Sequence, residues 1–173
     1  MSNTVPDAIS WLSNMPKAAE RALAETLNQA ATATRSRAID EIGRQLNLPR
    51  SYISENIAVR SRANPQKLEV IISAESRGIL LNRFDGQQIT TDGKNAGVSV
   101  QVKAGGPRKT IKRGFFMRLK NGVTGLAMRT GKGKGAIEVL HGPSVSQAWQ
   151  SVRDDVEPTP DELFNAFIER FNP

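Results

Sequence analysis

Basic side chains are the residues of this chain whose number and spacing point most directly to chemistry. Between Asp92 and Glu138 lie 45 residues without an acidic side chain, and eleven of them are Lys or Arg. Such a segment favours contact with polyanions, which means nucleic acid or the acidic surface of a neighbouring protein subunit. The alternative from charge alone is a well-solvated surface, which is the usual role of charged segments.

The charge is distributed unevenly along the chain. The 24 basic and 17 acidic residues give a net charge of +7. Residues 1–92 carry only +1, whereas residues 138–173 carry −5. A positive middle and a negative C-terminal part allow head-to-tail contact between opposite patches of adjacent copies.

Strand alternation gives the basic segment a more definite geometry. A strand over residues 111–120 would place Ile111, Phe115, Met117 and Leu119 on one face together with Arg113. Its other face would carry Lys112, an exposed Phe116, Arg118 and Lys120. No pair of Asn or Gln is presented on a helix, so contact with nucleic acid would be to the backbone, independent of sequence and sensitive to salt. The candidate contact for a polyanion or a subunit comprises Lys103, Arg108, Lys109, Lys112, Arg113, Phe116, Arg118, Lys120, Arg129, Lys132 and Lys134.

Catalytic chemistry is poorly supported. The chain has one histidine, His141, and no cysteine, so neither a zinc site nor a thiol nucleophile is expected. The carboxylates at 154–157 precede an expected helix start, where negative charge favours the helix dipole without a metal ion. The segment 125–132 imitates a phosphate-binding loop, but its glycine spacing is one residue too long and Gly133 replaces the Ser or Thr that holds Mg²⁺. We predict a non-enzymatic protein with no metal and no cofactor.

A helix-turn-helix over residues 38–57 is the main alternative. The apolar positions from Ala38 to Ile53 have the rhythm of that motif, and it would make the protein a sequence-specific DNA-binding regulator. Pro49 crowds the turn, however, and the basic segment lies about 50 residues downstream. A helix end followed by a packed turn is the simpler interpretation.

The elements that must position these residues are predicted as an α+β fold. A long helix over 14–47, ended by Pro49, has one apolar face with Leu23, Leu27, Ala30, Ala31, Thr34, Ala38, Ile42 and Leu46. It would span about 50 Å at 1.5 Å per residue, so part of it would pack on a neighbouring subunit. It packs on a small, mainly antiparallel sheet over 66–140, and a C-terminal helical region follows over 145–173.

Local patterns refine these boundaries. Residues 51–63 read as a short helix or turn, and alternation predicts strands over 68–72, 98–102, 111–119, 124–130 and 137–140. Glycines at 105–106 and 131–135 mark connections, and 85–95 reads as a long surface loop. Thr159, Pro160 and Glu162 predict a helix start, with a helix over 160–171 that buries Leu163, Phe164, Phe167 and Ile168.

The size and composition predict a single domain over residues 1–173. The N-terminus lacks the pattern of a signal peptide, and no segment approaches the roughly 20 apolar residues of a membrane span. We therefore expect a protein made in a reducing cytoplasm with no membrane partner.

The chain resembles the minor tail protein Z family of long-tailed bacteriophages, the tail completion proteins. The resemblance is carried by an ordered set of short motifs: residues 68–72, 78–81, 114–116, 119–122, 128–129, 137–140 and 142–145, followed by the apolar helix over 163–171. A long Ala-rich helix and an Arg-rich segment over 50–62 precede them. The chain departs from the family pattern in a less basic middle and in the acidic linker 154–157.

This resemblance implies a structural virion protein at the head-proximal end of the tail, made in the host bacterial cytoplasm. It implies a role in completing the tail and preparing it for head joining and genome passage. The implied partners are further copies in a ring, often of six, the tail terminator, the tail tube or other neck proteins, and the backbone of the phage DNA without sequence specificity.

Overall fold

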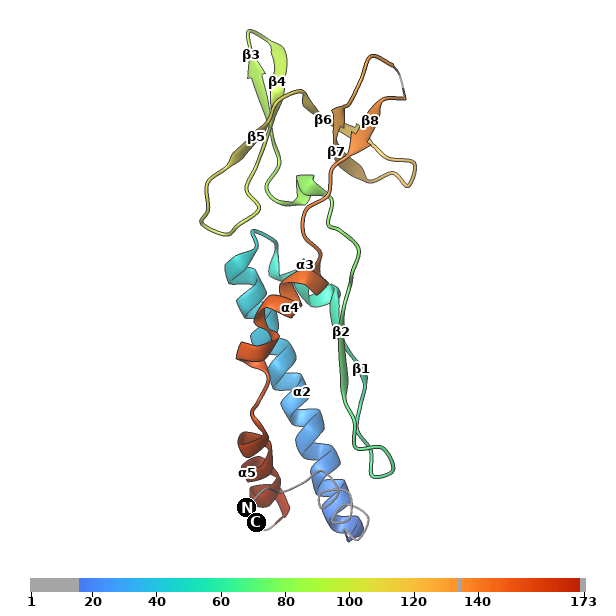
Figure 1. The fold of residues 1–173 in the computed structure, drawn as a ribbon, viewed down its shortest axis with the longest axis vertical. Helices are drawn as coiled ribbons and strands as arrows, with labels where there is room; N and C mark the ends of the chain where they lie inside the picture. The colour runs from blue at the N-terminus through green and yellow to red at the C-terminus, as the bar shows by residue number, and fades with distance from the viewer. Residues whose placement is uncertain (1–15, 134, 172–173) are drawn as a thin grey trace. The chain divides into compact units, whose positions relative to one another are not determined.

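The computed structural model describes residues 16–133 and 135–171, and it confirms the predicted α+β class. Its helices and strands are labelled in Figure 1. They group into two compact units. Unit 1 comprises Met1–Ser36, Val59–Ser73 and Val156–Pro173, and unit 2 comprises Arg37–Ala58 and Ala74–Asp155. The single domain over the whole chain stays a prediction.

Helix α2, Lys17–Gln45, is the long helix predicted from the Ala-rich segment. The predicted start at Asn14 lies outside the described residues. The helix ends two residues earlier than predicted because Leu46 forms a backbone bridge with Lys103, and the Asn47 N–H donates to the carbonyl of Val102. Of the predicted apolar face, Ala31, Thr34, Ala38, Ile42 and Leu46 are buried, whereas Leu23, Leu27 and Ala30 are half-buried.

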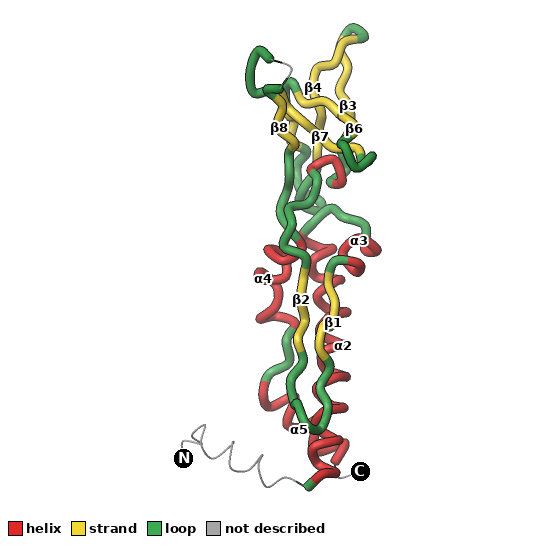
Figure 2. The backbone as a smooth tube through the Cα atoms, turned by 90° about the vertical axis from the view of Figure 1, so that its right-hand side faces the viewer, coloured by secondary structure: helices red, strands yellow, loops and turns green. Residues whose placement is uncertain are grey.

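Strands β1 (Ile57–Ser61) and β2 (Ile71–Ala74) form a two-stranded ribbon, seen side by side in Figure 2. The expectation of a helix or turn through residue 63 is therefore wrong, and so is the start of the β region at residue 66. The β-branched residues Ile57 and Val59 favour a strand that can pair with β2. In unit 1 the ribbon is attached to α2 by a reciprocal pair of hydrogen bonds. The Asn28 side-chain amide donates to the Ala63 carbonyl, and the Ala63 N–H donates to Asn28 Oδ1, both at 2.9 Å.

Helix α5, Pro160–Phe171, also packs on α2 within unit 1, and its bounds match the prediction. Its start is a capping box: the Thr159 N–H donates to a Glu162 carboxylate oxygen at 2.8 Å, and the Glu162 N–H donates to Thr159 Oγ1 at 3.3 Å. The predicted buried set is only partly correct. Phe167 is buried against Ala19, but Phe164 and Ile168 are exposed, because α2 covers only one side of the helix.

In unit 2, a second sheet contains β3 (Gln87–Thr91), β4 (Lys94–Val100) and β5 (Lys109–Ile111) in the order β3-β4-β5. The predicted surface loop over 85–95 is therefore wrong for most of its length. Asp92 and Gly93 both have positive φ angles, as a two-residue hairpin turn requires, and they connect β3 to β4. The strand predicted from Val98 begins four residues earlier as a result.

A third sheet contains β6 (Gly114–Arg118), β7 (Thr124–Arg129) and β8 (Ile137–Val139), all antiparallel. The strands predicted over 124–130 and 137–140 are confirmed. Val98 and Val100 of the second sheet and Leu126 of the third are the buried centre of a shared cluster. Leu81, Val102, Ile111, Phe116 and Leu140 pack around that centre.

The remaining elements of unit 2 are α3 (Arg50–Glu55), the short 3-10 helix η1 (Leu81–Arg83) and α4 (Val145–Val156). Helix α4 has a capping box of its own, in which the Gln147 N–H donates to Ser144 Oγ at 3.1 Å and the Ser144 N–H donates to Gln147 Oε1 at 2.9 Å. It buries Val145, Ala148, Trp149, Val152 and Val156 at helical spacing. No helix in the described part of the chain is long and apolar enough to cross a membrane.

Candidate interaction site

The predicted strand over residues 111–120 is interrupted, and this changes the candidate basic surface. Strand β5 ends at Ile111, Lys112 and Arg113 form a turn with Arg113 at φ +65°, and β6 begins at Gly114. The turn resets the alternation, so Ile111 and Phe116 pack into the same apolar cluster. Phe116 is therefore half-buried against this cluster, and the prediction of an exposed phenylalanine encircled by cations is wrong.

Arg108 is committed to contacts within unit 2. Its guanidinium pairs with the Asp85 carboxylate and donates to the Asp85 carbonyl, while Nε donates to Ser99 Oγ at 3.2 Å. Hydrogen bonds from Arg108 and Gln87 to the carboxylate hold the pKa of Asp85 below its ordinary value of 3.8. Asp85 also has a positive φ of 50°. Arg108 thus anchors the segment before β5 to the end of η1, and a phosphate would have to compete with that pair.

Five of the other basic residues lie at opposite ends of β6. In the antiparallel register, Gly114 pairs with Met128 and Arg118 pairs with Thr124. Lys112, Arg113 and Arg129 therefore lie at one end of the strand, where the guanidinium of Arg129 sits 5.6 Å from the Phe115 ring centroid. Arg118 and Lys120 lie at the other end, about 15–20 Å away at roughly 3.3 Å per residue.

Three further cations complete the described basic set, and all three are exposed. Lys103 forms the backbone bridge with Leu46, Lys109 begins β5, and Lys132 lies in the loop after β7. Lys134 lies outside the described residues. Five of the predicted cations therefore lie at the two ends of β6, while Lys103, Lys109 and Lys132 lie elsewhere in unit 2.

The acidic residues at 154–157 do not all precede a helix start, contrary to the expectation from the sequence. Asp154 and Asp155 lie in the last turn of α4, where negative charge is unfavourable to the helix dipole, and Asp154 pairs with Arg153 at 3.1 Å. Only Glu157 precedes the next helix. Across the described ranges there is no group of three or more histidines and carboxylates that could hold a metal ion.

The helix-turn-helix alternative meets a geometric obstacle in α3. This helix has six residues, about 9 Å of length, and a β-strand begins two residues later. Ile53 is fully buried, and Arg50 is paired with Asp40 of α2 at 2.8 Å. A helix this short, with its residues engaged in contacts within the protein, offers little surface to a DNA major groove.

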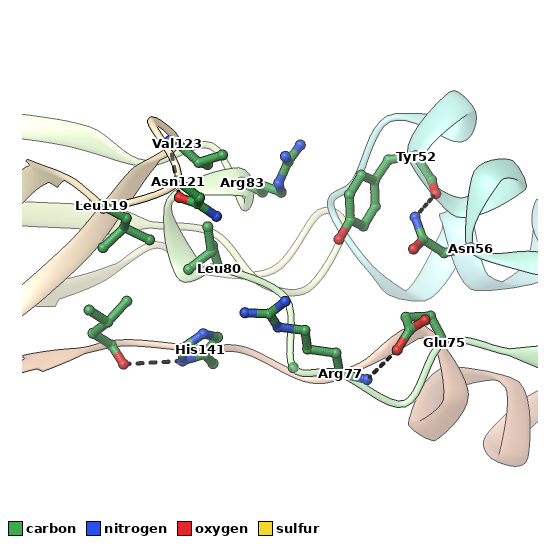
Figure 3. Close-up of a pocket in the computed structure, with 12 residues that line it drawn as sticks. Tyr52, Asn56, Glu75, Arg77, Leu80, Arg83, Leu119, Asn121, Val123 and His141 are labelled. Carbon is green, nitrogen blue, oxygen red and sulfur yellow. Dashed lines mark hydrogen bonds between the residues drawn. The ribbon is translucent and has the colours of Figure 1, made fainter.

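A pocket that the sequence did not indicate lies within unit 2 and has a volume of about 520 Å³ (Figure 3). Its apolar lining includes Leu80, Leu119, Val123 and Val139. The segment carrying Leu80 is joined to the segment carrying His141 by a backbone bridge, and the Gly142 N–H donates to the Ile79 carbonyl at 2.7 Å. The lining thus comes from four stretches of chain, around residues 52–56, 75–83, 119–123 and 139–141.

Cations and polar groups surround this apolar lining. The Arg83 guanidinium lies 4.7 Å from the centroid of the Tyr52 ring, and the Asn56 side-chain amide donates to the Tyr52 carbonyl at 2.7 Å. Figure 3 shows the Arg77 side chain extending toward the middle of the pocket, while its backbone N–H donates to Glu75 Oε1 at 3.1 Å. His141 forms part of this wall, with Nδ1 3.1 Å from the Val139 carbonyl. The arrangement suits an apolar partner that carries negative charge.

Comparison with known proteins gave one family. A sequence-family model described as prophage minor tail protein Z (GPZ) matches residues 4–166. Neither the search of curated proteins nor the search of solved structures gave a match.

Proposed function

The chain belongs to the prophage minor tail protein Z family, and from that premise we propose that it completes the head-proximal end of a phage tail. Membership over nearly the whole chain makes it a structural component of a phage tail. This match is the observation that carries the proposal. The finer role is to cap the growing tail and prepare it for joining to the head and for passage of the genome.

In this role the protein acts as several copies around the tail axis, in a ring that contacts the tail tube, the tail terminator or other neck proteins. The exposed cations at the two ends of β6 support such a role, because they can face either a packaged DNA backbone or an acidic neighbouring ring. Phosphate contact of this kind carries no sequence information and weakens as salt rises.

The position in the virion is tested by labelling. A phage carrying an epitope-tagged copy is imaged with gold-conjugated antibody, and label is expected where the tail meets the head. Deletion of the gene should leave tails that do not join to heads, and supply of the protein in trans should restore joining. Label at the distal tip of the tail, or none on the virion, would contradict the proposal.

The basic groups are tested separately in the same phage. Charge reversal of Lys112, Arg113 and Arg129 is compared with charge reversal of Arg118 and Lys120. At least one set is expected to reduce the yield of joined particles or their retention of DNA. Reversal of Lys94 together with Arg62, two exposed cations outside both groups, is the control that matches the change in net charge of the two-residue set. If both charge-reversal variants give normal particles, the polyanion role is contradicted.

A further inference from the structure

Helix α5 presents more apolar surface than α2 covers. At 3.6 residues per turn, its apolar positions from Leu163 to Ile168 fill an arc of roughly 140°. One side of that arc, at Leu163 and Phe167, faces α2, and Phe167 is only 3% exposed. The other side comprises Phe164, Ile168 and Phe171, which are 57%, 42% and 42% exposed. We refer to these three residues as the α5 stripe.

The spacing of the α5 stripe is typical of a helix that binds in a groove of a partner. Positions i, i+4 and i+7 are the anchors by which an amphipathic helix inserts into an apolar site of a partner. Single exposed apolar residues are normal on protein surfaces, but three large ones on one helical face mark an interaction surface. Asp161, Glu162 and Glu169 give the same helix an acidic character, while Arg170 is engaged by Glu25 at 3.0 Å.

This acidity restricts what can cover the α5 stripe. Two α5 helices packed face to face would bring their carboxylates together, and like charges at a contact are repulsive. A partner surface should instead be apolar in its centre and positive at its rim. The pocket of unit 2 is lined by Leu80, Leu119, Val123 and Val139, and its two arginines, Arg77 and Arg83, outweigh its one carboxylate, Glu75, which accepts from the Arg77 N–H. Lys120, between two lining residues, adds a further exposed cation.

We propose that the α5 stripe of one copy docks into the Tyr52–His141 pocket of a second copy. The contact is heterologous, since each copy contributes the helix on one side and the pocket on the other. Repetition of such a contact closes into a ring or continues as a filament, depending on the rotation between copies. The inference deepens the proposed function, because it rests on several copies assembling around a tail, and it names the surfaces that join them.

Complementary variants of the full chain test this contact in solution. One variant carries Phe164→Gln and Ile168→Gln, and the other carries Arg77→Glu and Arg83→Glu. All four side chains are exposed, so both variants should fold, and circular dichroism checks this. Each alone is expected to lose self-association in sedimentation velocity, by about tenfold or more. An equimolar mixture should form a heterodimer, because it retains one intact helix and one intact pocket. Lys94→Glu with Arg62→Glu, at two exposed cations outside both the pocket and the candidate basic set, is the charge-matched control and should behave as wild type.

Cross-linking reports the contact directly and does not depend on a stable ring. The chain has no cysteine, so single cysteines can be introduced cleanly at Phe164 and at Val123, a pocket-lining residue that is 36% exposed. A short bifunctional maleimide should join Phe164→Cys of one copy to Val123→Cys of another, in solution or on isolated tails. Cross-links only between two copies of Phe164→Cys, or none in either setting, would overturn the proposal. A mixture of complementary variants that stays monomeric while wild type assembles would do so as well.

The outcomes separate this inference from the proposed function. If the Phe164–Val123 cross-link forms but the gold label lies elsewhere in the virion, the contact between copies is supported and the head-proximal role is contradicted. If the label is head-proximal but no cross-link forms, the head-proximal role is supported and the contact between copies is contradicted.

Discussion

The reciprocal hydrogen bonds between Asn28 and Ala63 make the attachment of the β1–β2 ribbon to α2 measurable. Replacing Asn28 with Ala removes both bonds without adding bulk. Each such bond contributes about 0.5–1.5 kcal/mol net, so their loss costs about 1–3 kcal/mol. Alanine is a better helix former than asparagine by up to about 0.7 kcal/mol, which offsets part of that loss. The expected destabilisation is therefore about 1–2 kcal/mol.

Urea denaturation followed by far-ultraviolet circular dichroism measures this difference. Ser36→Ala, on the exposed side of the same helix, is the matched control and should be neutral or slightly stabilising. Asn28→Asp should be destabilised as well, since it keeps the acceptor for the Ala63 N–H but places an oxygen against the Ala63 carbonyl. Hydrogen exchange should show faster exchange of the Ala63 amide in both variants. If Asn28→Ala unfolds within about 0.5 kcal/mol of the control, the two bonds do not hold the ribbon and the reasoning fails.

Three further changes have defined outcomes. Gly142→Ala should destabilise unit 2 by about 1–3 kcal/mol in urea denaturation, because the added Cβ would lie 2.5 Å from the buried ring of Phe84; a neutral change would mean that the ring can move. The Arg108 pair stabilises the ionised Asp85, so the contribution is present above pH 3.8 and is lost as the pH falls through the lowered pKa of the folded state. Stability titrations should therefore show wild type losing its advantage over Asp85→Asn on acidification, and a constant difference would contradict the assignment. Thr159→Ala should cost about 0.5–2 kcal/mol of α5 stability, seen as faster amide exchange in its first turn, whereas Thr159→Ser should retain the cap.

Local chemistry predicted α5 better than any other element. Thr159, Pro160 and Glu162 fix its start through short-range hydrogen bonds, and those depend on little beyond the neighbouring residues. The same reasoning would have placed α4, since Ser144 and Gln147 have capping-box spacing, and Asp92-Gly93 would have revealed the β3–β4 hairpin. These capping and turn patterns are present in the sequence itself.

Other features depend on contacts between distant segments. Nothing local marks Arg113 as a residue with a positive φ angle, so an apparently unbroken alternation over 111–120 concealed the turn that packs Phe116 against the apolar cluster. Charge alone could not distinguish Arg108, which is bound to Asp85, from the exposed cations around it. The pocket combines residues as far apart as Tyr52 and His141, and only the fold brings them together.

The outer edge of β3 affects how copies of this chain behave when they are crowded. Among the described strands β3 pairs with β4 alone, so a row of its backbone donors and acceptors is open to a further strand. The bulge at Ala96 of β4, between the pairs Ile89–Gly97 and Thr90–Asn95, increases the local twist of the hairpin, and four of the five β3 residues are polar and exposed. A colliding chain therefore cannot extend the sheet over a long stretch, and the hairpin resists growth into fibrils. Copies can gather at one place at high local concentration and still associate through side-chain surfaces, without merging their sheets.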